Sequence, residues 1–281
     1  MTTVDLLGRF LLKHRKLMVL SGAGCSTDSG IPDYRDEDGN WKHSRPVQFG
    51  DFLRDAGTRR HYWARSFAGW QRISRARPNA AHAALAALEQ CGRLSLLITQ
   101  NVDNLHRIAG SRNVVDLHGV LHQVRCLGCG DISPRETLQH RLSALNPGWQ
   151  ADAARFAPDG DAVLDVTVTA DFAIADCDIC GGLLKPDVVF FGESVPPDRV
   201  QRARQHLAEC DALLVIGSSL MVWSGFRFAR LAAESGKPLA IINRGKTRAD
   251  DLAYCKVEAG CAETLSQVLP QVLRESGAAD A

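Results

Sequence analysis

The chain has 281 residues, of which 33 are Lys or Arg and 32 are Asp or Glu, so its formal net charge is +1. A charge this balanced provides no long-range attraction to nucleic acids or to anionic membranes. Hydrophobic residues make up 45% of the chain, as in an ordinary globular protein, and no apolar run approaches the ~20 residues of a membrane span. We therefore expect one large domain, or one domain with a smaller insertion, and neither a membrane nor a nucleic-acid partner.

Residues 1–16 predict an amphipathic helix. Asp5 stands near the start of this segment, and leucines are interspersed with Arg9 and Lys13. A signal peptide would have a basic start and then a continuous apolar stretch. A secretory signal is therefore not expected.

Short apolar runs that alternate with helical patterns predict an α/β protein with a mostly parallel sheet. The clearest helical pattern extends from Asn79 to Cys91, with Asn79 as the N-cap and Gly92 as the stop signal. The predicted strands are 17–20, 94–98, 213–216 and 239–242.

Small polar residues follow each of these four strands. In open α/β sheets the ligand lies at the carboxyl ends of the strands, so the four loops predict a single ligand site, although polarity alone is also what surface loops have. The four loops are Ser21–Gly24, Thr99–Asp103, Gly217–Ser219 and Asn243–Gly245.

Four of the nine cysteines form two CxxCG units, Cys126 with Cys129 and Cys177 with Cys180. Four thiolates would close a tetrahedral zinc site with no open position, which is typical of a structural ion. The glycine that follows each unit lets the backbone turn around the sulfur atoms. A redox pair or unpaired core cysteines remain the alternatives.

The odd number of cysteines and the length of the chain argue against a disulfide framework. We therefore expect a reducing compartment, which is the cytoplasm of a bacterium or the mitochondrial matrix of a eukaryote. The cysteine pairs lie within a stretch, residues 120–187, where no helix–strand alternation is visible. The sequence predicts that this stretch is a small inserted module and that residues 1–119 and 188–281 form the main domain.

The segment after the first strand, Gly22 to Arg35, is rich in glycine and could approach a pyrophosphate closely. It does not fit the GxGxxG pattern, because Thr27 occupies the sixth position and no acidic residue ends a second strand some 20 residues later. An ordinary dehydrogenase is therefore disfavoured. Residues Gly30 to Arg35 are polar and rigid, and they predict a lid that orders over a ligand.

Several motifs occur in one order and together resemble the sirtuin family of NAD-dependent protein deacylases. The resemblance extends from about Lys16 to Cys261. The motifs are Gly22-Ala-Gly24, Ser29-Gly-Ile-Pro-Asp-Tyr-Arg35, Thr99-Gln-Asn-Val-Asp103, Leu117-His-Gly119, the two CxxC pairs, Phe190-Phe-Gly-Glu193 and Gly217-Ser-Ser219. Tyr34, the segment Lys185–Gly192 and the long gap between the cysteine pairs are similar to the class II branch.

The resemblance implies a Rossmann-like NAD-binding domain with a smaller zinc module. It also implies a reaction in which the acyl oxygen of an acyl-lysine attacks C1′ of NAD, which releases nicotinamide and leaves O-acyl-ADP-ribose and free lysine. The substrate lysine would belong to a protein or peptide that binds as an extended strand between Val189–Gly192 and Leu220–Val222. A monomer is expected.

His118 would be the catalytic base, since an imidazole can take a proton from a ribose hydroxyl near neutral pH. The alternative is a structural histidine, which is our interpretation of His82, His106 and His122. Asn101 and Asp103 would act with His118, Asn101 on the nicotinamide ribose and Asp103 on the nicotinamide amide; capping of a helix is the other interpretation of this pair.

The resemblance further implies a set of NAD contacts, with Tyr34 shielding C1′ from water. The set comprises Gly22, Ala23, Gly24, Ser26, Ile31, Asp33, Tyr34, Arg35, Gln100, Asn101, Val102, Asp103, Gly217, Ser218, Ser219, Asn243, Arg244, Gly245 and Cys261.

The insertion contains an acidic segment, Asn146 to Asp176, with six Asp and one Arg and three aromatic residues. Trp149, Phe156 and Phe172 either anchor the insertion or line an acyl channel that favours long or neutral acyl chains over succinyl. Tyr62-Trp-Ala-Arg65 is similar to a Tyr-x-x-Arg motif that reads acidic acyl chains in another sirtuin branch, but an exposed helix face is the favoured interpretation. Two rival functions stay open, a mono-ADP-ribosyltransferase and a non-catalytic zinc-bearing binding module.

Overall fold

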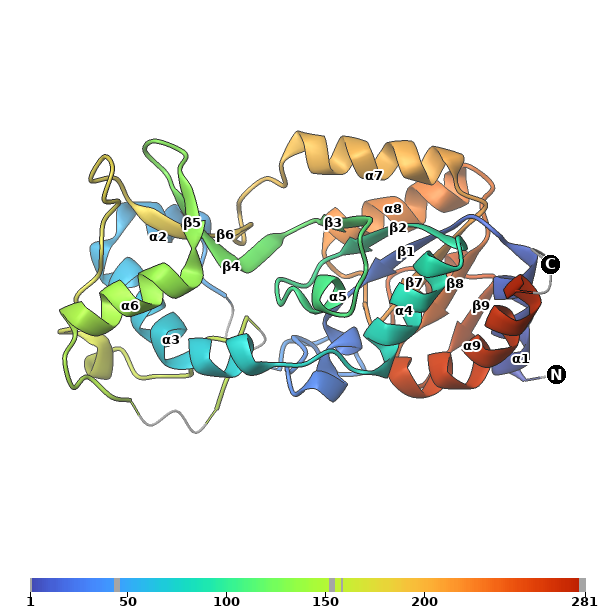
Figure 1. The fold of residues 1–281 in the computed structure, drawn as a ribbon, viewed down its shortest axis with the longest axis horizontal. Helices are drawn as coiled ribbons and strands as arrows, with labels where there is room; N and C mark the ends of the chain where they lie inside the picture. The colour runs from blue at the N-terminus through green and yellow to red at the C-terminus, as the bar shows by residue number, and fades with distance from the viewer. Residues whose placement is uncertain (1, 43–45, 152–154, 158, 278–281) are drawn as a thin grey trace.

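A six-stranded parallel sheet forms the larger part of the molecule in the computed structural model, which describes residues 2–42, 46–151, 155–157 and 159–277 (Figure 1). The strands are ordered β3-β2-β1-β7-β8-β9, and every neighbouring pair is parallel. The predicted α/β class and the four predicted strands are confirmed. The strand bounds are β1 Leu17–Ser21, β2 Leu94–Thr99, β3 Val114–Asp116, β7 Ala212–Ile216, β8 Leu239–Ile242 and β9 Cys255–Val257.

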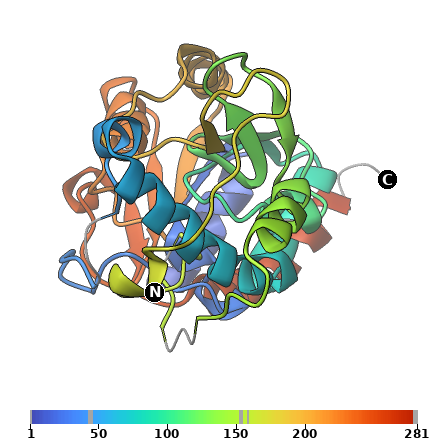
Figure 2. The ribbon, with the colours of Figure 1, turned by 90° about the vertical axis from the view of Figure 1, so that its left-hand side faces the viewer.

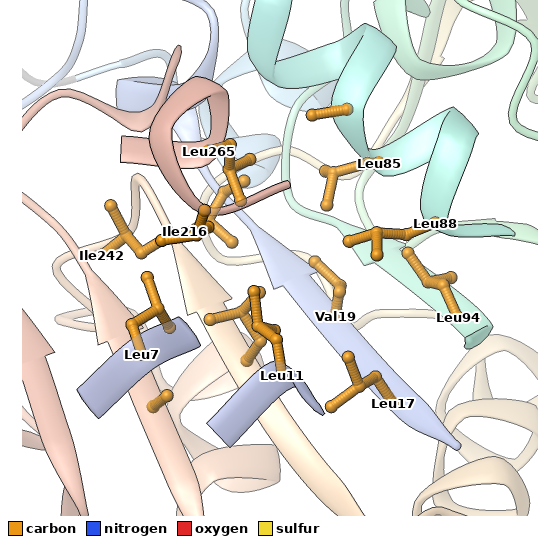
Figure 3. Packing of buried hydrophobic residues seen from close by; sticks show 14 of the residues in the cluster. Leu7, Leu11, Leu17, Val19, Leu85, Leu88, Leu94, Ile216, Ile242 and Leu265 are labelled. Atoms are coloured by element: carbon orange, nitrogen blue, oxygen red, sulfur yellow. The ribbon is translucent and has the colours of Figure 1, made fainter. Parts of the chain in front are cut away.

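Helices cover both faces of this sheet. On one face lie α1 (Thr3–Lys13), α4 (Ala80–Gln90) and α9 (Cys261–Gly277), and on the other lie α7 (Pro197–Glu209) and α8 (Trp223–Glu234). Figure 3 shows how Leu7 of α1, Leu85 of α4 and Leu265 of α9 converge on the strands, where their side chains have no exposed surface. Burial of each such leucine stabilises the fold by roughly 1.5–3 kcal/mol.

The ends of α4 confirm the helix predicted there. Oδ1 of Asn79 accepts a hydrogen bond from the N–H of Ala81 at 2.9 Å, and Nδ1 of His82 accepts one from the N–H of Asn79 at 3.2 Å. Gly92 follows the helix at φ = +74°, the left-handed conformation of a glycine C-cap. The predicted N-terminal helix is confirmed as α1, which carries a capping box between Thr2 and Asp5.

A second, antiparallel sheet of three strands, ordered β5-β4-β6, forms the smaller part at the left of Figure 1. The strands β4 (Gly119–Cys126) and β6 (Leu184–Val188) lie at the two ends of the predicted insertion, and β5 is Ile132–Pro134. Helix α6 (Arg135–Leu145) lies within the insertion, and Figure 2 shows it at the near end of the molecule together with α3. Of these strands, only β5, with three residues, is too short to show its period in the sequence.

Two helices from outside the insertion complete this smaller part. They are α2 (Phe49–Arg54) and α3 (Ala56–Arg75), whose Phe52, Tyr62 and Trp63 share one buried cluster with Val124 and Leu138 of the insertion. The Tyr62–Arg65 segment therefore lies on the buried face of α3, and the favoured interpretation as an exposed face is wrong. The remaining short helices are η1 Ala23–Cys25, η2 Thr27–Ser29, α5 Leu105–Ile108, η3 Thr167–Thr169 and η4 Asp250–Leu252.

The strand order reverses between β1 and β7, since β2 and β3 lie on one side of β1 while β7, β8 and β9 lie on the other. A reversal of this kind opens a crevice at the carboxyl ends of the two central strands. The fold thus brings the loops after β1 and β7 to the place where an α/β protein binds its ligand. Among the helices of the described residues, none combines the length and the apolar character that a membrane span requires.

Candidate active site

The loops after β1 and β7 meet backbone to backbone. The N–H of Gly22 donates to the carbonyl of Ile216 at 3.0 Å, and the N–H of Gly24 donates to that of Gly217 at 2.8 Å. Gly217 has φ = +60°, and a Cβ there would lie 2.2 Å from the backbone nitrogen of Cys25. Only glycine fits this position, because an added side chain would both be strained and collide with backbone.

A cavity of about 610 Å³ opens between these loops and the smaller part of the molecule. This size is within the range of small-molecule and cofactor sites, ~300–1,000 Å³. Most of the residues predicted to contact NAD line it, namely Gly22, Ala23, Gly24, Asp33, Tyr34, Arg35, Gln100, Asn101, Val102, Gly217, Ser218, Ser219, Asn243 and Arg244, and His118 lines it as well.

Five of the predicted contact residues are not in the cavity wall. Ser26 and Asp103 lie directly behind it, and Ile31 packs in a buried cluster with Leu105. Gly245 lies against the backbone of Glu37 at φ = +76°. The last of the five, Cys261, is part of the hydrophobic core on the α4 face of the sheet. The structure therefore gives these five no direct access to the cavity, and their contacts with NAD stay predictions.

A network of buried hydrogen bonds links Asn101 and Asp103 to the loop after β1. Nδ2 of Asn101 donates to the carbonyl of Gly22 at 3.0 Å and to Oγ of Ser26 at 3.1 Å. Oδ2 of Asp103 accepts from the Ser26 hydroxyl at 2.7 Å, and Oδ1 accepts from the N–H of Leu105 at 2.9 Å. Burial raises the pKa of the Asp103 carboxyl, while these donors oppose that shift.

The Leu105 bond also shows that the helix-capping interpretation of this pair is partly correct. Asn104 is the N-cap of α5, but Oδ1 of Asp103 accepts from the N–H of Leu105, the first residue of the helix, and Oδ2 is bound to Ser26. The carboxylate therefore has a structural role whatever it contacts in the cavity.

His118 has both ring nitrogens engaged. Nδ1 lies 3.0 Å from the carbonyl oxygen of Gln100, and Nε2 lies 2.8 Å from Oγ of Ser224. Burial, together with the charges of Arg199 and Arg227, lowers the pKa of His118 to about 4. The ring is therefore neutral at pH 7, the form in which an imidazole can accept a proton.

The segment after β6 is held by a partly buried ion pair at the edge of the cavity. Nζ of Lys185 lies 3.0 Å from Oε2 of Glu193, and the same oxygen accepts from the N–H of Phe190 at 2.8 Å. The N–H of Val189 donates to the carbonyl of His118 at 2.8 Å. The predicted peptide segments Val189–Gly192 and Leu220–Val222 both line the cavity.

The cavity wall also contains residues that the sequence analysis missed. Trp41 packs against Tyr34 with ring centroids 6.1 Å apart, and the Arg35 guanidinium lies 4.1 Å from the Trp41 ring centre. Ser224 and Arg227 of α8 lie near His118. These residues carry no motif, and their proximity comes from the packing of α8 and of the loop before α2.

The acidic segment of the insertion contributes one described residue to this wall, Asp159. Among the described residues that line the cavity, none is an aromatic residue of this segment. Trp149 and Phe172 pack against Phe67 of α3, with ring centroids 5.8 and 5.5 Å away, and Phe156 lies over Arg72. The anchoring interpretation of these aromatics is therefore correct. Asp152 and Pro158 lie outside the described residues.

Arg65 is engaged by the same segment. Its Nε donates to the carbonyl of Ala162 at 2.8 Å, and its own carbonyl accepts from the N–H of Ala162 at 3.0 Å. Tyr62 lines the cavity, but Arg65 does not. Arg65, the arginine of the Tyr-x-x-Arg motif, therefore has a structural role in this protein.

The four cysteines of the two CxxCG units lie close together in the smaller part of the molecule, where β4 ends at Cys126. Their sulfur atoms all lie within 4.8 Å of one another, with 3.5 Å between Cys126 and Cys180 and 3.8 Å between Cys129 and Cys177. A tetrahedron with zinc–sulfur distances of about 2.3 Å has edges of about 3.8 Å, so this donor set fits a zinc ion. Gly130 and Gly181 have φ of +77° and +69°, as the predicted tight turns require.

A second cluster, Cys25 with His82 and His106, also has its donor atoms within 4.8 Å of one another. The protonation of His82 argues against a metal there. Its Nδ1 accepts from the N–H of Asn79, so its neutral ring carries the proton on Nε2 and has no lone pair left for an ion. The structural interpretation of His82 is supported by this bond.

Comparisons with known proteins agree with the geometry. The model of the Sir2 family matches residues 22–224, well over half of the chain. An "NAD-dependent protein deacetylase" of Xanthomonas campestris pv. campestris (strain 8004) is 58% identical over 260 residues, which are 92% of this chain and 89% of the relative. The "NAD-dependent protein lipoamidase sirtuin-4, mitochondrial" of Bos taurus is 49% identical over 268 residues, 94% of this chain and 85% of the relative.

Solved structures show the same fold. A structure described as "Sir2-p53 peptide-NAD+" superposes with a TM-score of 0.78 at 30% sequence identity, covering 96% of this chain and 98% of that one. Another, described as "Sir2 bound to acetylated peptide", superposes with a TM-score of 0.77 at 29% identity and equal coverage. Coverage this complete includes both the large parallel sheet and the small antiparallel one.

Proposed function

The chain belongs to the Sir2 family, and from this membership we propose that it removes acyl groups from the lysine side chains of proteins, with NAD as the co-substrate. The products are nicotinamide, O-acyl-ADP-ribose and free lysine. The observation that carries this proposal is the neutral His118 in the wall of a cavity whose other walls are the glycine loops and Asn101.

The residues of the cavity fit NAD in their chemistry. Close approach of the Gly22–Gly24 and Gly217 backbones leaves room for a pyrophosphate, and the hydroxyls of Ser218 and Ser219 can donate to phosphate or ribose oxygens. The loop after β8 is shaped by Nδ2 of Asn243, which donates to the carbonyl of Arg244 at 2.7 Å, and this loop would hold the adenosine end.

Bound NAD supplies an electrophilic ribose carbon, C1′, with nicotinamide as the leaving group. Asn101 would orient the nicotinamide ribose, Asp103 would set the position of the nicotinamide amide, and Tyr34 would keep water from the reacting carbon. His118 would then take a proton from a ribose hydroxyl: the O–H bond breaks, an N–H bond forms at Nε2, and the electron pair stays on oxygen.

The substrate would bind as an extended strand between Val189–Gly192 and Leu220–Val222, with its acyl-lysine directed toward His118. The Lys185–Glu193 pair supports this arrangement, because it fixes the turn that follows the first of these segments. We place one structural zinc ion at Cys126, Cys129, Cys177 and Cys180, remote from these steps, where it would hold the small module together.

The acyl choice follows from Asp159 and Arg65. A carboxylate in the cavity wall repels an acyl chain that ends in a carboxylate, and the arginine that could attract it is bound to Ala162. Long or neutral acyl chains are therefore favoured over succinyl, and the resemblance to the class II branch supports this. The protein acts as a monomer in a reducing compartment, the bacterial cytoplasm, without a nucleic-acid or membrane partner.

The experiment that tests this function mixes the protein with NAD and a panel of acyl-lysine peptides, and follows both peptide deacylation and labelling of protein by ADP-ribose. Deacylated peptide and O-acyl-ADP-ribose are expected. Labelled protein without deacylation would favour the mono-ADP-ribosyltransferase, and no NAD-dependent product would favour the non-catalytic binding module.

His118→Ala extends this assay to the base. Deacylation is expected to fall by ~10²–10⁴-fold, while the affinity for NAD measured by calorimetry changes little, because the base acts on a hydroxyl after NAD is bound. His140→Ala, on the exposed surface of α6, is the matched control. An unchanged rate in His118→Ala would remove His118 from the mechanism.

A further inference from the structure

The hydroxyl of Ser224 occupies the nitrogen of His118 that the proposed reaction needs. Ser224 lies in the first turn of α8, is 8% exposed, and has its Oγ 2.8 Å from Nε2. The other ring nitrogen, Nδ1, lies 3.0 Å from the carbonyl oxygen of Gln100. Nothing in the sequence motifs assigns a role to Ser224.

The direction of both bonds follows from the chemistry of the groups. A carbonyl oxygen can only accept, so Nδ1 must carry the proton. In a neutral imidazole the other nitrogen then has a lone pair, so the hydroxyl of Ser224 is the donor and Nε2 the acceptor. In this direction the bond exists only while His118 is neutral, and once the ring is protonated Nε2–H can donate to Oγ instead.

We propose that Ser224 is a positioning residue for His118, whose hydroxyl fixes the orientation of the ring and the Nδ1-protonated tautomer, with Nε2 at the cavity wall. The proposal rests on the proposed function for its catalytic meaning. When the ribose hydroxyl binds to Nε2, the Ser224 hydroxyl turns away. When the proton then moves from that ribose oxygen to Nε2, the new N–H can donate to Oγ of Ser224, which changes from donor to acceptor.

The pKa of His118 depends first on the charged groups around the ring. Arg199 of α7 and Arg227 of α8 oppose a positive charge on the ring, and the Gln100 carbonyl favours one. The carboxylates of the adjoining segment, Asp187 and Glu193, are paired with Arg125 and Lys185. The Ser224 oxygen can accept from the protonated ring, and a hydrogen bond from a charged donor is stronger than one to the neutral ring, so its loss must lower the pKa of His118.

The test measures the titration of His118 by NMR in the free protein with isotope-labelled histidine, assigned with His118→Ala. Ser224→Ala is expected to lower the pKa of His118 by about 0.5–1 unit, up to a tenfold change in the protonation constant. Ser224→Thr keeps the hydroxyl and is expected to restore the parent value. Ser111→Ala is the matched control, because Ser111 is a buried serine whose hydroxyl has no partner among the described residues.

The second readout is the pH profile of deacylation. In Ser224→Ala the acid limb of kcat/KM is expected to move to lower pH by the same amount as the NMR titration, with the KM for NAD unchanged. An unchanged His118 titration in Ser224→Ala would overturn the proposal and leave Ser224 as a packing residue. If Ser224→Ala fails to fold, Ser224→Cys, a near-isosteric weak donor, is expected to give a smaller shift in the same direction, and no shift there overturns the proposal as well.

The two proposals fail in different ways. Loss of the proposed function would appear as a parent protein without deacylation, or as an active His118→Ala variant. The NMR titration needs no turnover, so a shift in Ser224→Ala would still demonstrate the hydrogen bond to the ring in that case.

Discussion

The hydroxyl of Ser26 donates to Oδ2 of Asp103 at 2.7 Å, directly behind the wall of the cavity, and so connects the loop after β1 to the loop after β2. Asp103 accepts a second bond from the N–H of Leu105. The carboxylate therefore uses both oxygens to fix the relative position of two loops on neighbouring strands.

Replacement of this carboxylate by an amide is the first prediction. Asp103→Asn leaves one oxygen for two donors, so one hydrogen bond to a charged group is lost, worth about 1.5–3 kcal/mol. We expect nicotinamide inhibition and nicotinamide exchange to weaken by ~10–100-fold, as measured by the inhibition constant and by isotope exchange. Asp131→Asn, an exposed carboxylate near the cysteine cluster, is the control. Equal nicotinamide inhibition in Asp103→Asn and the parent protein would contradict the role in reading the amide.

Removal of one thiolate from the cysteine cluster is expected to unfold the small module. Cys180→Ala would leave three ligands and an incomplete zinc shell, and the binding free energy of a structural zinc ion is folding free energy. Metal analysis of the purified protein should show one zinc per chain for the parent and much less for Cys180→Ala, with a lower soluble yield. Cys91→Ala, a partly buried cysteine outside the cluster, should behave like the parent. A folded, active and zinc-free Cys180→Ala protein would refute the structural role of the ion.

The buried histidine of α4 makes stability dependent on pH. Burial lowers the pKa of His82 to about 4, whereas the unfolded chain protonates near pH 6.5. Between these values the unfolded state binds a proton that the folded state does not, so the free energy of unfolding falls as the pH falls, by up to ~1.4 kcal/mol per unit.

His82→Gln separates this contribution from the other titrating groups. Glutamine at this third helical position preserves the capping box with Asn79 but does not titrate. Urea unfolding at pH 7.5 and 5.0 should show a loss of stability that is smaller by about 1–2 kcal/mol in His82→Gln than in the parent. His140→Gln, on an exposed helix surface, should not change the loss. Equal losses in parent and His82→Gln would show that His82 protonates in the folded protein.

The loop after β1, the polar ends of the strands and α4 could be predicted because each depends on local sequence. Asn79 and Gly92 bound a helix by capping chemistry, and the four apolar runs are long enough to show as strands. The three-residue strand β9 and the small antiparallel sheet could not be found, because pairing with a partner strand, rather than local sequence, makes them strands.

Local sequence also reveals the predicted site residues, whereas packing between distant segments places those that could not be predicted. His118 lies in a recognisable motif, but Ser224 reaches it only because α8 packs across the end of the sheet. Trp41 and Asp159 enter the cavity from loops whose course is set by long-range contacts. The buried face of α3 was misread for this reason, since its partner is the insertion 60 or more residues later.

The acyl preference has a direct test at the cavity wall. Asp159→Asn removes a negative charge from the cavity wall where we propose that the acyl chain binds, so succinyl peptides should gain relative to acetyl and lipoyl peptides, by up to ~5-fold as expected for a partly screened charge pair. Rates over the three peptides at saturating NAD measure the ranking. Asp171→Asn, on the exposed part of the same segment, should leave it unchanged. If Asp159→Asn ranks the three peptides as the parent does, Asp159 does not select the acyl chain.

The contact between the loops after β1 and β7 limits which substitutions this protein can accept during evolution. The backbones of Gly22, Gly24 and Gly217 meet at one end of the cavity, and a Cβ on Gly22 would lie 2.7 Å from the carbonyl oxygen of Gly217. A side-chain contact can be rebuilt by a compensating substitution at a neighbour, but a backbone collision cannot. The part of the cavity walled by side chains such as Tyr62 and Asp159, where we propose that the acyl chain binds, is free to diversify while the glycine end is held constant, so new acyl specificities can arise on a fixed glycine site.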